Sequence, residues 1–169
     1  MSSFYRLCIP ITLLLILSFI SSAKDGNLLL KGTIVKKGCT IETRDITVSL
    51  GEIPVKHFKN TAGIKSPMIP FSIKLTNCSS PSVSLMFAGG EFGNTGLIAL
   101  TGDDSAQGVV IELSNNNGAL IALNKETESL TPNKDEDVEF NFNANYLSVS
   151  PNVKAGKANA EAIFSVKYN

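Results

Sequence analysis

Short stretches of alternating apolar and polar residues recur along the chain, and clusters of Gly, Pro, Asn and Asp separate them. Alternation with a period of two is typical of β-strands that bury one face and expose the other. No segment of ten or more residues keeps the 3.6-residue period of an amphipathic helix. The pattern therefore predicts an all-β protein.

The segment 55–66 has the weakest alternation and is expected to hold a short helical turn. Many short strands with turn signals between them favour a β-sandwich of immunoglobulin type. No linker rich in Pro, Gly or Ser and no internal repeat interrupts the pattern, which indicates one domain after the N-terminal region. The strands are predicted at residues 26–34, 46–50, 69–78, 83–87, 109–113, 138–146 and 158–168.

The chain begins with features of a secretory signal. Arg6 precedes an apolar run from Ile9 to Ile20, and the small residues Ser21-Ser22-Ala23 follow it. This order is typical of a signal peptide, here residues 1–23. The apolar run is about a dozen residues, shorter than the roughly 20 that a membrane-spanning helix needs. We therefore expect the leader to be removed and no membrane anchor to be retained; a retained anchor is the alternative.

Two cysteines remain after the predicted cleavage, Cys39 and Cys78. An exported protein meets conditions that oxidise thiols, so we expect these two residues to form a disulfide. The alternative is a metal site, but it would need further soft or imidazole ligands. The chain offers only His57 and no Cys-x-x-Cys motif.

Charge and composition exclude several classes of partner. Loss of Arg6 with the leader leaves 14 of the 15 basic residues against 15 acidic ones, a net charge of −1. The chain has no tryptophan, and its aromatic residues do not alternate with a basic stripe. Nothing in this balance favours nucleic acid or acidic lipid, and we expect neither as a partner.

Catalytic and metal-binding patterns are weak. His57 with Asp45 or Asp103 and a serine could form a hydrolase triad, but no Gly-x-Ser-x-Gly elbow supports it. The pair Asp103-Asp104 and the run 135–137 lack the spacing of a calcium loop with its closing glutamate. We predict a protein that is not an enzyme and that has no cofactor or metal.

The two ends of the chain are unusual for a sandwich. An apolar face near the N-terminus consists of Gly26, Leu28, Leu30, Gly32 and Ile34, which makes a well-patterned strand at a free end. The last predicted strand has no partner strand after it in the printed sequence. A sandwich that lacks its closing strand would expose its apolar interior along a groove, which a stable monomer does not tolerate.

These features resemble the pilin subunits that the chaperone–usher pathway assembles in Gram-negative bacteria. In the ending, Gly156 is the fourteenth residue from the C-terminus and Tyr168 the penultimate one, which matches the assembly signature of the family. The details are similar to a minor, tip-associated subunit of type 1-like fimbriae, with the rod subunit as the alternative. The resemblance rests on GTIVKKGCTI around Cys39, ITVSLGEI at 46–53, PFSIKLTNC at 70–78, AQGVVIEL at 106–113 and AGKANAEAIFSVKYN at the end.

The resemblance implies an incomplete immunoglobulin-like sandwich, with a pilin domain at 38–169 that a donor strand completes. A periplasmic chaperone would lend the first strand, and residues 24–37 of the next subunit would replace it at the outer-membrane usher. The protein would pass through the periplasm to a fimbria on the cell surface and contribute to adhesion. The alternative is a secreted adhesin that binds a host glycan or protein directly. The groove edge would consist of Gly156, Ala158, Ala160, Ala162, Phe164, Val166 and Tyr168.

Overall fold

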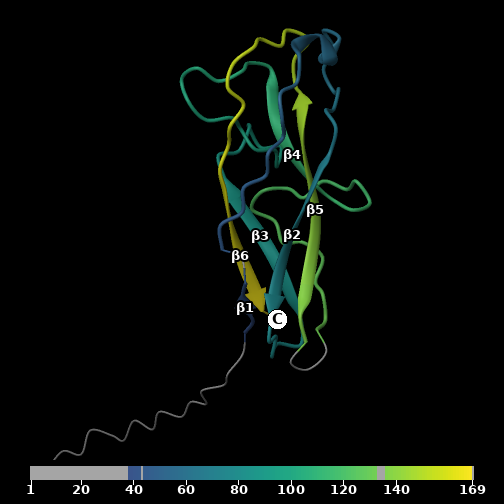
Figure 1. The fold of residues 1–169 in the computed structure, drawn as a ribbon, viewed down its shortest axis with the longest axis vertical. Coiled ribbons are helices and arrows are strands. Elements are labelled where there is room, and N and C mark those ends of the chain that lie inside the picture. Colours follow the sequence, from purple (N-terminus) through teal and green to yellow (C-terminus); the bar gives the residue numbers. More distant parts are fainter. Residues whose placement is uncertain (1–37, 43, 133–135, 169) are drawn as a thin grey trace, which may run out of the picture. The chain divides into compact units, whose positions relative to one another are not determined.

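Six strands in two antiparallel sheets form the part of the protein that the computed structural model describes, residues 38–42, 44–132 and 136–168 (Figure 1). The predicted signal peptide and the predicted strand at 26–34 lie outside these residues. The larger sheet has the order β1 (Thr40–Ile41), β2 (Ile69–Thr76), β5 (Val138–Ser148) and β4 (Val109–Asn115). The smaller sheet pairs β3 (Val83–Gly89) with β6 (Ala162–Tyr168). The predicted all-β fold is confirmed.

The strands form where the sequence alternates, because alternate side chains point to opposite faces of a sheet. In β5 the inward residues Val138, Phe140 and Phe142 are buried, whereas Glu139 and Asn141 between them are exposed. In β3 and β4, residues of both faces are buried. Segments outside the named strands pair with these two strands and cover their edges, which accounts for part of that burial.

Phe142 connects the two sheets at the centre of the core. Its ring meets Phe71 of β2 at a centroid distance of 5.5 Å and Phe87 of β3 at 5.2 Å in an edge-to-face arrangement. Around this contact, Leu75 and Leu85 have no exposed surface. The core therefore forms between the inner faces of the two sheets, as a β-sandwich requires. Among the described residues the helical structure is a single 3-10 turn, η1 (Val55–Phe58), which agrees with the short turn expected in 55–66. That part of the chain contains no helix long and apolar enough to cross a membrane.

Cys39 and Cys78 form the predicted disulfide, with their Cα atoms 4.1 Å apart. The neighbouring backbone reinforces this link, because the Ser79 amide donates to the Gly38 carbonyl at 2.9 Å. The bridge joins the residue before β1 to the loop after β2. The start of the domain is thus fixed to the larger sheet.

Two predicted strands differ from the structure. Residues 46–50 are not part of any sheet, and the last strand begins at Ala162 instead of residue 158. The segment before β6 instead pairs with residues 101–107: the Ala106 amide donates to the Lys157 carbonyl at 2.8 Å, and the Thr101 amide to Asn159 at 2.8 Å. Gly156, Ala158 and Ala160 therefore precede β6 and are not part of it.

Gly156 allows the backbones of these two segments to touch. A Cβ at this position would lie 2.4 Å from the Ala106 amide nitrogen and 2.7 Å from the Asp104 carbonyl oxygen. Both distances are far below van der Waals contact, and the atoms concerned are backbone atoms that cannot rotate away. Any residue with a side chain would separate the two segments.

Removal of the disulfide should lower the stability of the domain. The double variant Cys39→Ala/Cys78→Ala, which leaves neither thiol unpaired, should lose about 4 kcal/mol of unfolding free energy, because the closed loop no longer restricts the unfolded chain. Urea unfolding of the oxidised protein and of this variant measures the difference. A change below about 1 kcal/mol would show that the bridge has no such role.

Gly156→Ala should destabilise the domain by about 1 to 3 kcal/mol, because the added methyl group forces the two backbones apart. Gly90→Ala is a matched control: no atom lies within 4 Å of its Cβ position. The control should change the unfolding free energy by less than about 0.5 kcal/mol. Equal effects of the two substitutions in urea unfolding would contradict the proposed backbone contact.

Candidate interaction groove

The strand β6 has one paired edge and one edge without a partner. It pairs with β3 from Val83↔Tyr168 to Gly89↔Ala162. Along its other edge, no backbone hydrogen bond to another described residue is present. By contrast, the outer edge of β3 is covered, because the amides of Thr127 and Leu130 donate to β3 carbonyls at 2.8 Å. A seven-residue strand with free N–H and C=O groups is a template for a further strand.

The inner face of β6 is apolar and incompletely covered. The register places Phe164 beside Phe87, and Val166 beside Leu85. Their partners on β3 are 5% and 0% exposed, whereas Phe164 and Val166 are only half-buried. The sandwich interior is therefore closed over β3 and remains accessible along β6.

The segment 44–53 forms the opposite wall. Ile46, Val48 and Leu50 are half-buried and alternate with exposed Thr47 and Ser49. This is the alternation that predicted a strand at 46–50. The described residues, however, provide no backbone hydrogen bond to this segment. The side chains are arranged as in a strand, but a neighbouring strand is missing.

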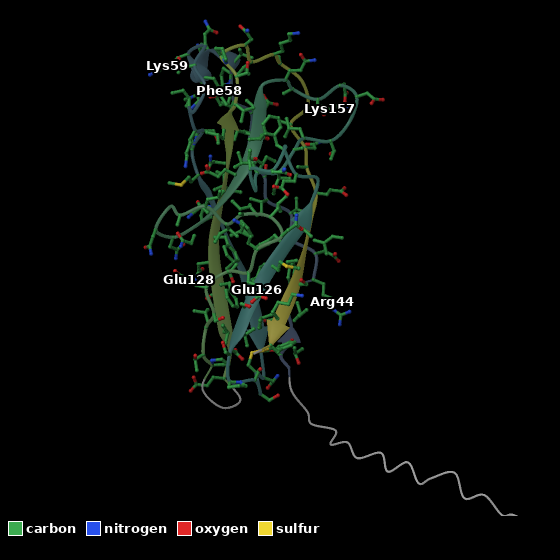
Figure 2. All side chains as sticks on the ribbon, turned by 180° about the vertical axis from the view of Figure 1, so that it is seen from behind. Arg44, Phe58, Lys59, Glu126, Glu128 and Lys157 are labelled. Carbon is green, nitrogen blue, oxygen red and sulfur yellow. A yellow bond between two sulfur atoms is a disulfide. The ribbon has the colours of Figure 1, made fainter. Side chains whose placement is uncertain are left out.

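A hollow of about 290 Å³ lies between the two walls at the start of β6. Ile41, Arg44 and Asp45 line it on one side, and residues 162–164 line it on the other. Figure 2 shows Arg44 beside β6. Two charged side chains thus flank an otherwise apolar opening.

The opposite end of β6 is tied to the disulfide. The Cys39 amide donates a hydrogen bond to the Tyr168 hydroxyl at 3.1 Å. The Tyr168 ring lies 3.7 Å from the position that a Cβ would take at Gly38. Tyr168 therefore links the end of β6 to the residues just before β1.

The structure brings together only part of the predicted site. Ala162, Phe164, Val166 and Tyr168 lie on one face of β6 as expected. Ile41, Arg44 and Asp45, which line the hollow opposite β6, were not predicted as part of a site. The only sequence signal near them was the alternation of residues 46–50 in the same wall. The predicted donor residues Gly26, Leu28, Leu30, Gly32 and Ile34 lie outside the described residues.

The groove offers backbone hydrogen bonds and apolar contacts. His57 lies in η1, where its Nε2 is 3.0 Å from the Lys65 carbonyl oxygen and its ring packs edge-on against Phe58. Asp104 pairs with Lys157 at 2.8 Å. Within the described ranges, no three His, Cys, Asp or Glu side chains come close enough to hold a metal. The arrangement can bind an extended peptide as an added strand.

Comparison with known proteins gives one consistent result. The family model described as "Fimbrial protein" matches residues 28–169. The fimbrial-like protein FimF of Salmonella typhimurium is 30% identical over 151 residues, which is 88% of this chain and 87% of that protein. A type-1 fimbrial protein subunit of Serratia marcescens is 32% identical over 178 residues, which is 96% and 98% of the two chains.

Solved structures share the fold. The P pilus rod subunit PapA superimposes with a TM-score of 0.66 at 21% identity, over 78% of this chain and 99% of that one. A chaperone–usher pilus structure gives a TM-score of 0.64 at 21% identity, over 85% and 95%. Together with the incomplete sandwich, the family match and the two relatives show that the chain belongs to the fimbrial protein family and is a structural subunit of a fimbria.

Proposed function

We propose that this subunit polymerises by donor-strand exchange, with its groove along β6 as the acceptor and residues 24–37 as the donor for a neighbouring subunit. The observation that carries this proposal is the free edge of β6 beside a wall, residues 44–53, that alternates like a strand and has no ladder. A single inserted strand would supply hydrogen bonds to that edge and cover the exposed inner face.

The donor sequence has the pattern that such a groove requires. Leu28, Leu30 and Ile34 lie on one face of an extended chain. Burial of each of these side chains contributes roughly 1.5 to 3 kcal/mol. Each new backbone hydrogen bond adds about 1 kcal/mol net. Gly32 lies on the same face and has no side chain, so it would fit where the acceptor groove is shallow.

The same free edge explains the need for further partners. An unpaired apolar edge promotes aggregation, so a newly exported subunit requires temporary cover. A periplasmic chaperone would provide a strand at β6 until an outer-membrane usher exchanges it for the donor strand of the next subunit. The relatives are fimbrial proteins, which supports a polymer on the bacterial surface. This role requires no enzymatic activity and no cofactor. The matches to fimbrial subunits over most of their length do not favour a free-standing adhesin.

A charge on the inner face of β6 should prevent strand insertion. Phe164→Asp should weaken binding of a synthetic peptide of residues 24–37 by at least about thirty-fold, or about 2 kcal/mol, because the inserted strand would bury the carboxylate. Fluorescence anisotropy of the labelled peptide measures the affinity. Leu120→Asp is the matched control, since Leu120 pairs with β4, does not line the groove and is 45% exposed. Equal affinities of the two variants would contradict the assignment of the groove.

Removal of the donor segment should abolish the donation of a strand to the next subunit and should leave the acceptance of a strand unchanged. A subunit that lacks residues 24–36 should bind the donor peptide as the full mature chain does. It should fail to extend a fibre, because it has no strand for the next groove. Electron microscopy and native gel electrophoresis of assembly mixtures measure fibre growth. Normal growth of fibres from the shortened subunit would rule out residues 24–37 as the donor.

A further inference from the structure

The first two described residues, Gly38 and Cys39, form a junction that is anchored to the domain on both residues. The Gly38 carbonyl accepts the Ser79 amide at 2.9 Å and the Ser79 hydroxyl at 3.2 Å. The Cys39 amide donates to the Tyr168 hydroxyl at 3.1 Å, and its sulfur is bonded to Cys78. These bonds fix the backbone on the domain side of the Gly38 Cα atom.

Gly38 has a backbone conformation that residues with a side chain rarely adopt. Its φ is +146°, whereas extended L-residues reach only to about −160°. Glycine takes a positive φ without a steric penalty. Lack of space is not the reason for a glycine here, because a Cβ would meet only the Tyr168 ring, at the ordinary contact distance of 3.7 Å. Glycine at this position therefore serves the direction of the backbone.

The φ angle of Gly38 is the rotation that connects the domain to the residues before it. Because the carbonyl side of Gly38 is anchored, a change of this angle moves the preceding chain and leaves the domain in place. An L-residue would have to rotate through 180° by at least about 50° to reach its own allowed region. The anchored junction thus turns one torsion angle into a fixed direction of exit.

The direction of exit matters because the proposed donor strand lies directly before the junction. Ile34, the last apolar residue of the donor face, is only four positions from Gly38 in the sequence. This stretch spans at most about 14 Å even when fully extended. Few torsion angles are therefore available between the inserted strand and the junction to absorb a rotation at Gly38.

A donor strand that is inserted into another subunit still carries its own domain. The accepting groove fixes the strand, and the short connection then holds the donating domain beside the accepting one. The donating domain must clear the accepting domain, and the direction set at Gly38 decides how it is placed. A direction that is fixed in advance also reduces the conformational freedom that is lost on insertion.

We propose that Gly38 is a positioning residue for strand donation: its positive φ, held by the bonds of the junction, sets the direction in which residues 24–37 leave the domain for the groove of a second copy of this chain. This inference rests on the proposed donor-strand exchange and assigns a residue to the donating side of it. Gly38 acts through the backbone and does not belong to the accepting edge of β6.

The full mature chain can be made with either hand of alanine at this position. Cys39 follows Gly38 directly, so a peptide thioester of residues 24–38 can be ligated to residues 39–169, followed by refolding and oxidation. The groove of each product is filled with the synthetic peptide of residues 24–37, so that the product can only donate. A chain that lacks residues 24–36 serves as the acceptor, and native gel electrophoresis measures the rate at which the one-to-one complex forms.

Gly38→Ala should slow this donation by about ten-fold, because the strand leaves the domain in another direction and its insertion costs additional ordering. Gly38→D-Ala should donate within about two-fold of the glycine form, since a D-residue adopts positive φ as readily as an L-residue adopts negative φ. Gly118→Ala is a matched control: it also places an L-residue at a positive φ, here +78°, with no atom within 4 Å of its Cβ position. It should leave donation unchanged.

The affinity for the donor peptide separates positioning from a merely structural role. Gly38→Ala should bind this peptide as the glycine form does, whereas general loosening of the junction would also weaken binding, because Tyr168 is tied to Cys39. The positioning role is wrong if L-alanine donates as fast as glycine, if both alanines or Gly118→Ala slow donation equally, or if peptide affinity falls along with donation; the groove assignment then stands. If the glycine form neither binds the peptide nor donates its strand, both proposals fail.

Discussion

The unpaired edge of β6 is the constraint on which the rest of the structure depends. A backbone edge with free donors and acceptors beside an incompletely covered apolar interior is a template for pairing with another strand and promotes aggregation. Neither of the adjacent elements covers it in the described structure: β3 already pairs with the other edge, and no backbone hydrogen bond joins residues 44–53 to β6. In the proposed donor-strand exchange the missing strand comes from another chain, and incompleteness is then the basis of assembly.

Several side-chain and backbone contacts hold the groove beside β6 in a defined shape. Phe142 fixes one sheet against the other, and Gly156 lets the segment before β6 pack directly on the backbone at 104–106. Tyr146 adds a further tie, because its hydroxyl donates to the Ala158 carbonyl at 3.0 Å. These contacts keep β6 in place although one of its edges has no partner. In the proposed exchange, the groove would therefore be formed before the donor strand arrives.

Local alternation was sufficient to predict most of the fold. The strands β2, β3, β4 and β5 lie where the two-residue period placed them, and the disulfide follows from the only two cysteines in the predicted mature chain. The two-residue period wrongly predicted strands at 46–50 and at the residues just before Ala162. Alternation of side chains shows which face of a segment is buried, but it does not show whether the backbone forms hydrogen bonds to a neighbouring strand. The backbone contact of Gly156 and the charged walls at Arg44 and Asp45 depend on residues distant in sequence, so no local pattern indicated them.

The hydrogen bond between Tyr168 and Cys39 connects formation of the groove to formation of the Cys39–Cys78 disulfide. The Tyr168 ring rests on the loop that this bridge holds in position, so the Tyr168 end of the groove depends on covalent bond formation. In the reducing cytosol the two thiols would stay apart and the loop would be free to move. A binding-competent groove would then form only after thiol oxidation, which would restrict the proposed strand exchange to an oxidising compartment.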